Sequence, residues 1–313
     1  MKTRSVEFYA CGDKIVGTVY LPDDYQEGTK LPCVIPTSGF TGLNVVYPAL
    51  FARLLTQHGY GCVGFDYRGW KPSEGKVGHT TFQGEYDDIT AAYVFATQQP
   101  EFDPNNISLF GWGYAGPVCI KVASDNPKIK AVAIGNSYSS GDNYLRGSMS
   151  EEAYAERMKK VEQDRIARVL TGKGEYEDCY ELYAYQSGYG ENDYLTKTLT
   201  KLTPEIAGIV VRDYGSAANF PPRQSWEHIE DLMHVNVDKE AAGLGERGLF
   251  IGVGELDALG GLNESKRLYA LAGPEKELYI VPGGRHNDWM FDDNPEFIKF
   301  GAALVAFYDK YMK

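Results

Sequence analysis

Short apolar runs alternate with amphipathic segments along most of the chain, and this alternation is the strongest constraint on its fold. The runs are LPCVIP, GCVGF, ISLF, AVAIG and LFIGV. A strand that is buried on both faces has such a continuous apolar pattern, which is typical of parallel sheets covered by helices. Segments between the runs, such as 48–59 and 80–100, carry apolar residues at helical spacing. The alternation therefore predicts a mostly parallel sheet with helices on both faces.

The alternation is interrupted once, over residues 141–235, and then resumes. This segment is polar and irregular, and only its part over 151–170 has the charged, amphipathic pattern of a helix. A connection of this length is too long for a simple loop. We interpret it as a cap inserted into an α/β core that consists of residues 1–140 and 236–313.

Tyrosine is concentrated in and beside the inserted segment. Ten of the 23 tyrosines lie between Tyr138 and Tyr214. Because tyrosine joins a large ring to a polar hydroxyl, this enrichment is typical of a pocket roof that binds an aromatic or polyketide-like ligand. Tyrosine is also an amphipathic filler in purely structural caps, so both interpretations remain open. Tyr138, at the start of the segment, is a candidate substrate-binding residue.

Charge and cysteine content exclude several classes of function. The chain has 313 residues and a net charge of −12, which argues against a nucleic acid or an anionic membrane as partner. Its five cysteines are scattered without the spacing of a metal site, as expected for free thiols in a reducing cytoplasm. No secretory signal or membrane span is recognisable. We therefore expect a cytoplasmic protein that acts on a small molecule without metal or cofactor, either as a monomer or as a homodimer.

The most informative motif is GWGYAG at residues 111–116. It fits G-x-G-x-x-G, the loop that holds dinucleotide phosphates. That loop follows the first strand of a βαβ unit, with an acidic residue about 20 positions later. Here several predicted strands precede the motif, and the next strand ends in Asn136-Ser137 instead of an acidic residue. A dinucleotide site is therefore disfavoured.

The same residues also fit a nucleophile elbow, with Gly113 where the nucleophile should stand. An elbow requires an acid and then a histidine later in the chain, and Asp257 and His286 each follow a predicted strand. Parallel strands place such loops at one edge of the sheet. The backbone N–H groups of Phe40 and Tyr114 are candidates for an oxyanion hole.

In these motifs the chain resembles the α/β-hydrolase fold, and in particular the branch that includes YcjY-like hydrolases and fungal polyketide-processing hydrolases and transferases. The matching stretches are SGFTG, FDYRGW, GWGYAG, GELDAL and GGRHNDWM, which span Ser38 to Met290. The resemblance implies a serine nucleophile at position 113, an acid at 257 and a base at 286. Glycine at 113 departs from that pattern.

Glycine at the elbow leaves three functions open. In the first, His286, oriented by Asp257, acts as a general base on a small carbonyl substrate, as in a lyase, a cyclase or an enzyme of C–C bond chemistry. In the second, the protein is a serine esterase, thioesterase or acyl transferase whose nucleophile has been replaced by Gly113. In the third, it binds a ligand without turnover. No neighbouring side chain is placed to replace the missing hydroxyl.

Other residues near the motifs are weaker candidates. Trp70, Trp112 and Trp289 each stand beside a site motif and are candidate substrate-binding residues, although tryptophans in such loops often only pack. Glu255 competes with Asp257 for the role of the acid, and Asp288 is either a cap or a substrate contact. The remaining histidines are interpreted as structural; they are His58, His79, His228 and His234.

Overall fold

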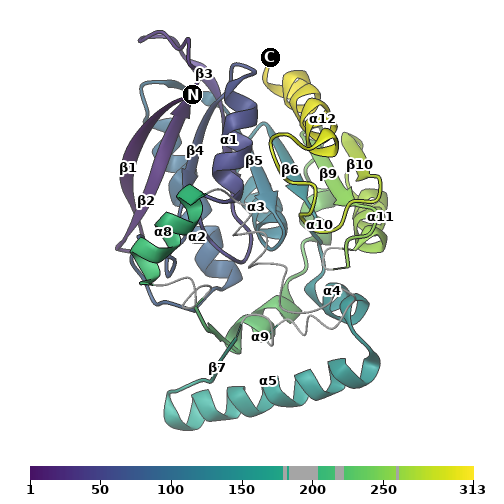
Figure 1. Cartoon of the computed structure of the whole chain (residues 1–313). Coiled ribbons are helices and arrows are strands. Elements are labelled where there is room, and N and C mark those ends of the chain that lie inside the picture. Colours follow the sequence, from purple (N-terminus) through teal and green to yellow (C-terminus); the bar gives the residue numbers. More distant parts are fainter. Residues whose placement is uncertain (179–181, 183–203, 216–221, 259–260) are drawn as a thin grey trace.

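A sheet of eight strands forms the centre of the computed structural model, in the order β1-β2-β4-β3-β5-β6-β9-β10 (Figure 1). The model describes residues 1–178, 182, 204–215, 222–258 and 261–313. The strands are β1 (Lys2–Ala10), β2 (Asp13–Leu21), β3 (Leu31–Thr37), β4 (Gly61–Phe65), β5 (Phe102–Trp112), β6 (Ala131–Gly135), β9 (Gly248–Gly254) and β10 (Lys276–Val281). The pairs β1–β2 and β2–β4 are antiparallel, and the other neighbours are parallel.

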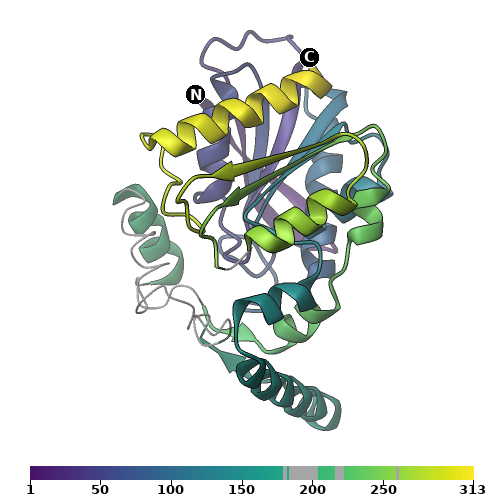
Figure 2. The same cartoon turned by 90° about the vertical axis from the view of Figure 1, so that its right-hand side faces the viewer.

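Helices cover both faces of this sheet. On one face lie α1 (Tyr47–Thr56) and α12 (Pro295–Met312), and on the other lie α2 (Phe82–Thr97), α3 (Ala115–Asp125) and α11 (Leu262–Leu271). Figure 2 shows β9 and β10 between α12 and α11. The architecture predicted from the apolar runs, a mostly parallel sheet between two helical layers, is confirmed.

Local chemistry accounts for several element boundaries. Thr81 begins α2, and its side-chain oxygen accepts a hydrogen bond from the Gly84 N–H at 3.1 Å. Asn294 caps α12 in the same way, through the Glu296 N–H at 2.8 Å. Such caps satisfy N–H groups that have no partner within the helix. The buried strands β4, β6 and β9 are the continuous apolar runs of the sequence, and each of their residues is buried.

The inserted segment lies between β6 and β9. Its elements are α4 (Gly141–Ser148), α5 (Glu151–Thr171), β7 (Tyr176–Glu177), α8 (Pro204–Tyr214), β8 (Gln224–Ser225) and α9 (Glu227–His234), and α10 (Asp238–Ala242) follows it before β9. The helix predicted over 151–170 is α5, which Figure 1 shows at the far end of the molecule. The expectation of an otherwise irregular segment was wrong for α4 and α9, because eight residues are too few to show a clear helical period. The cap boundaries at 141 and 235 stay a prediction.

A second, smaller apolar cluster joins this segment to the core. Its buried members include Tyr144, Trp226 and Leu232 from the insertion, together with Tyr138 just before it and Tyr114 at the start of α3. Five tyrosines of the predicted pocket roof lie outside the described residues; they are 180, 183, 185, 189 and 194. Within the described part of the chain, no helix has the length and apolarity to cross a membrane.

His228 of α9 is buried where the insertion meets the core. Its Nδ1 lies 2.9 Å from the Thr80 carbonyl oxygen, and its side chain has no exposed surface. Burial lowers the pKa of His228 from 6.5 to about 4. The folded protein therefore keeps this imidazole neutral at a pH where the unfolded chain is already protonated.

Acidification should destabilise the protein through this histidine. As the pH falls from 6.5 towards 4, protons bind the unfolded chain first, so the free energy of unfolding falls; at pH 5 the loss is about 2 kcal/mol. We expect His228→Gln, which keeps a donor for Thr80, to remove this contribution. The measurement is urea unfolding of both proteins at pH 7 and pH 5. His234→Gln, at an exposed end of α9, is the matched control. An equal pH dependence in His228→Gln and the parent protein would contradict the assignment.

Candidate active site

The elbow predicted at residues 111–116 is a sharp turn between β5 and α3. Gly113 has a φ of +55°, in the left-handed region that favours glycine. Three hydrogen bonds hold the turn: Gly113 N–H donates to the Gly135 carbonyl at 2.8 Å, and the Gly113 carbonyl accepts from Gly116 N–H at 3.1 Å and from Ser137 Oγ at 2.6 Å. A residue with a Cβ at this φ is strained by about 1–3 kcal/mol. Glycine therefore keeps the elbow and relieves its strain.

The loops after β9 and β10 bring Asp257 and His286 together. His286 Nδ1 lies 3.1 Å from Asp257 Oδ1 and 3.2 Å from Oδ2. The Asp257 side chain is fully buried and that of His286 is 14% exposed. The carboxylate accepts the Nδ1–H, which leaves Nε2 as the proton-accepting nitrogen.

His286 faces the position where the elbow lacks a side chain. A Cβ placed on Gly113 would lie 3.8 Å from His286 Nε2, and it would meet no other described residue within 4 Å apart from its chain neighbours. The structure therefore brings the three positions 113, 257 and 286 together. Among the described residues, the imidazole nitrogen is the atom that borders the missing side chain.

The competing acids are used elsewhere. Glu255 Oε2 accepts a hydrogen bond from Gly283 N–H at 2.9 Å, and Asp288 Oδ1 accepts one from Arg285 N–H at 2.9 Å. Both carboxylates brace the loop that carries His286. Asp257 is the one that pairs with the imidazole.

The loop that contains Phe40 lies against the elbow. A Cβ on Gly39 would stand 2.8 Å from the Trp112 carbonyl oxygen and 3.6 Å from Tyr114 N, so only glycine fits this approach. The Tyr114 N–H follows the turn directly, and none of the hydrogen bonds of the described residues uses it. The two predicted oxyanion residues thus come from adjoining segments of backbone.

Asn136 is a structural link that the sequence reasoning missed. Its φ is +43°, and its Oδ1 accepts from Gly254 N–H at 2.7 Å. Its Nδ2 donates to the carbonyl oxygens of Arg285 and His286. One side chain at the end of β6 therefore positions the end of β9 and the histidine loop. A polar residue directly after a buried strand was the available signal, and it was used only to argue against a dinucleotide site.

Helix α9 contacts both of the residues that were predicted to form the oxyanion hole, Phe40 and Tyr114. The His228 ring centroid lies 4.7 Å from that of Phe40 and 4.8 Å from that of Tyr114. Asp231 Oδ2 accepts hydrogen bonds from the Tyr114 hydroxyl at 2.8 Å and from Phe82 N–H at 2.5 Å. His228 was predicted to be structural, and its contacts could not be identified from the sequence because α9 itself was not predicted.

The aromatic residues predicted to bind substrate are all buried. Trp112 packs edge-on against His286, with ring centroids 5.8 Å apart, and Trp289 packs on the core with its indole N–H bonded to the Arg285 carbonyl at 2.8 Å. Trp70 donates to Thr80 Oγ1 at 3.2 Å, and Tyr138 stacks on Tyr144 at 4.6 Å. Protein atoms surround these four side chains, and their contact with a substrate stays a prediction.

Comparison with known proteins gives the family. The family model of the X-Pro dipeptidyl-peptidases (S15 family) matches residues 12–169. An Escherichia coli protein, described as an uncharacterized 31.7 kDa protein in the traX-finO intergenic region, is 27% identical over 144 residues, which are 46% of this chain and 50% of the relative. The chain thus spans about half the length of the curated relatives that it matches first.

Two solved structures share the fold over their whole length. The hypothetical protein PA2218 of Pseudomonas aeruginosa has a TM-score of 0.77 at 21% identity, over 99% of this chain and 94% of that one. The α/β hydrolase GrgF of a Penicillium species has a TM-score of 0.76 at 18% identity, over 100% of this chain and 99% of that one. With the sheet order and the family match, these likenesses confirm the predicted fold. The chain has the α/β-hydrolase fold and belongs to the X-Pro dipeptidyl-peptidase (S15) family.

Proposed function

We propose that this member of the α/β-hydrolase-fold enzymes works without a covalent intermediate, with His286 as a general base on a small carbonyl substrate. The observation that carries the proposal is the position of His286 Nε2, 3.8 Å from where a Gly113 side chain would begin. The imidazole is oriented by Asp257, and glycine at 113 supplies no hydroxyl beside it. A substrate can therefore occupy the volume that a nucleophile would fill.

The chemistry begins with a carbonyl oxygen on the backbone N–H groups of Phe40 and Tyr114. His286 Nε2 removes a proton from the α-carbon, and the C–H electron pair moves into the carbonyl to form an enolate. Asp257 stabilises the resulting imidazolium, and the N–H pair stabilises the oxyanion. The enolate carbon then attacks a second carbonyl carbon of the substrate, whose C=O π electrons move to oxygen, or the enolate expels a leaving group from the β-carbon. The imidazolium gives its proton to the new alkoxide or to the leaving group. Lyase and cyclase reactions share this first step.

The rate factors of a general base and an oxyanion hole are large enough for catalysis without a covalent step. A positioned general base contributes about 10²–10⁴-fold in rate, and a single oxyanion-hole donor about 10²–10³-fold. The tyrosines Tyr138 and Tyr144 near the elbow helix favour an aromatic or polyketide-like substrate.

A second function, a serine esterase or acyl transferase that has glycine at 113, is supported by one observation. The elbow keeps its φ of +55° and its hydrogen bonds although glycine does not need support of this kind. A serine would fit there with its hydroxyl beside His286 Nε2. A protein that binds a ligand without turnover would show neither of the activities described next.

The first test measures proton removal directly. The probe is acetoacetyl-N-acetylcysteamine in deuterium oxide, with α-hydrogen exchange followed by proton NMR. We expect the protein to accelerate exchange, His286→Gln to lose about 100-fold or more of that rate, and Asp257→Asn to lose a comparable factor through the wrong imidazole tautomer. His58→Gln, far from the elbow in the sequence and on the surface, is the control. Exchange that survives in His286→Gln would refute the role of this base.

The second test separates the two functions through position 113. Gly113→Ala and Gly113→Ser impose the same backbone strain of about 1–3 kcal/mol, but only serine adds a hydroxyl. For a base-only enzyme, we expect both variants to lose α-exchange and to hydrolyse p-nitrophenyl acetate within about tenfold of each other. Hydrolysis about 100-fold faster in Gly113→Ser than in Gly113→Ala, and abolished by adding His286→Gln, would instead favour the serine enzyme.

A further inference from the structure

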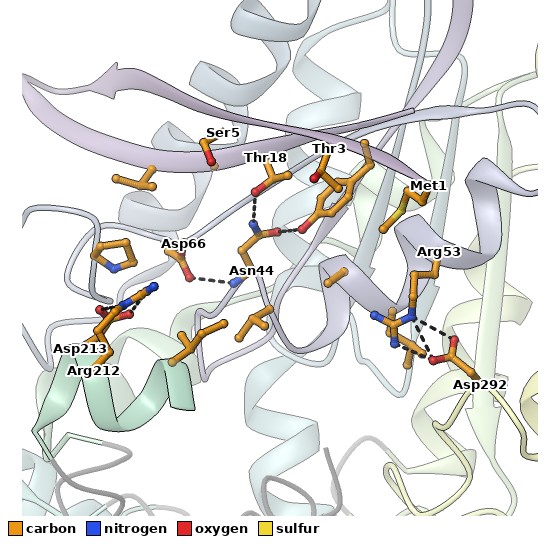
Figure 3. Close-up of a pocket in the computed structure, with 18 of the residues that line it drawn as sticks. Met1, Thr3, Ser5, Thr18, Asn44, Arg53, Asp66, Arg212, Asp213 and Asp292 are labelled. Atoms are coloured by element: carbon orange, nitrogen blue, oxygen red, sulfur yellow. Dashed lines mark hydrogen bonds and ion pairs between the residues drawn. The ribbon is translucent and has the colours of Figure 1, made fainter. Parts of the chain in front are cut away.

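A cavity of about 890 Å³ lies outside the candidate active site, and neither Gly113, Asp257 nor His286 lines it. Its walls are the strands β1 and β2, the start of α1, helix α8 and the segment 290–292 (Figure 3). A volume of this size is typical of small-molecule sites. The function proposed above makes no use of it.

The cavity contains a buried carboxyl group, that of Asp66 after β4. Asp66 is 8% exposed, and its Oδ1 accepts a hydrogen bond from Asn44 N–H at 2.9 Å. Its Oδ2 has no hydrogen-bond partner among the described residues. Burial is the main cause that raises the pKa of Asp66 to about 8. Without a counter-charge, the carboxylate form is therefore unfavourable in the folded protein.

The polar neighbours are already committed to other partners. Asn44 Nδ2 donates to Thr18 Oγ1 at 3.1 Å, and Asn44 Oδ1 accepts from the Tyr20 hydroxyl at 3.1 Å. Figure 3 shows Asn44 between the two strands and Asp66, with its side-chain amide directed at the strands. None of the hydrogen bonds formed by the side chains of Asn44, Thr18 and Tyr20 reaches Asp66 Oδ2.

The two cationic side chains of the cavity are also paired. Arg53 binds Asp292 at 2.7 Å at one end, and Arg212 binds Asp213 at 2.6 Å at the other. Figure 3 shows Arg212 and Asp213 at the same end as Asp66. Asp66 is thus the lining carboxyl that forms no ion pair among the described residues. Burial outweighs the nearby Arg212 guanidinium, which lowers the pKa of Asp66, and the Asp213 carboxylate raises it further. The remaining wall is largely apolar and includes Val45, Leu50, Ile209 and Phe291.

We propose that this cavity binds a small organic cation, a primary amine with an apolar body, whose ammonium group pairs with the Asp66 carboxylate. The ammonium supplies both the hydrogen bond and the charge that Asp66 Oδ2 lacks, and the apolar body covers the wall formed by Leu50 and Phe291. An anionic ligand would gain no counter-charge from Asp66, whose carboxyl is either neutral or negative. A metal ion would find one available carboxylate where it needs several oxygen ligands.

Binding should release a proton. At pH 7 the Asp66 carboxyl is mostly protonated in the free protein, and in the complex it is ionised beside the ammonium. The proton passes to the buffer, so nearly one proton is released per ligand bound. This linkage distinguishes an ion pair at Asp66 from nonspecific burial of an apolar group.

The test is calorimetric titration of the full chain at pH 7 with phenethylamine and with its neutral counterpart, phenethyl alcohol. We expect one amine per chain, affinity for the alcohol weaker by about tenfold or more, and proton release read from enthalpies in phosphate and Tris buffers. His286→Gln should leave the amine affinity within about twofold, which separates this site from the candidate active site. Equal affinity for amine and alcohol, or loss of binding in His286→Gln, would overturn the proposal.

Two variants locate the site. Asp66→Asn keeps an acceptor for Asn44 N–H, and we expect amine affinity to fall by about tenfold or more, with no loss of thermal stability. Ile209→Trp fills the cavity from α8 without touching Asp66 and should also abolish binding. Val211→Trp is its matched control, because Val211 lies on the same helix, is 47% exposed and does not line the cavity. Unchanged binding in Asp66→Asn or in Ile209→Trp would refute the site.

Discussion

Parallel pairing of β5, β6, β9 and β10 places four strand ends at one edge of the sheet, and the candidate site depends on this arrangement. The last residues of each strand are buried and paired within the sheet, so the residue that follows each strand has a defined starting point. Four features follow the strands in chain order: the elbow after β5, Asn136 after β6, Asp257 after β9 and His286 after β10. The hydrogen bonds of Asn136 then fix the loops relative to one another, because one amide holds both Gly254 and the backbone at His286. Residues far apart in the sequence thereby reach hydrogen-bonding distance without any local sequence preference for that geometry.

The sequence was most informative where local pattern and burial coincide. The apolar runs that became β4, β6 and β9, and the helical spacing that became α12, follow directly from side-chain periodicity. The pairing of Asp257 with His286 could be expected because both follow strands of one parallel sheet. Neither the prediction of these elements nor that of the Asp257–His286 pair required knowledge of contacts between distant residues.

Features that depend on tertiary contacts could not be read from the sequence. Helix α9 is short, and its role is visible only through the contacts of His228 and Asp231 with the oxyanion segment. Asn136 looks like an ordinary strand-end residue until its partners are known. The cavity beside Asp66 combines walls from β1, α1 and α8, three elements whose proximity no periodicity encodes. Burial of a charged group, in particular, is a property of the assembled molecule.

Helix α9 has a consequence for how the inserted segment and the elbow behave together. The same helix anchors the insertion through Ile229 and Leu232 and holds the Tyr114 hydroxyl through Asp231. A displacement of the insertion, such as one needed to admit a bulky molecule, would pull on the residue that follows Gly113. The position of the insertion and the alignment of the turn after Gly113 are therefore mechanically coupled through this one helix.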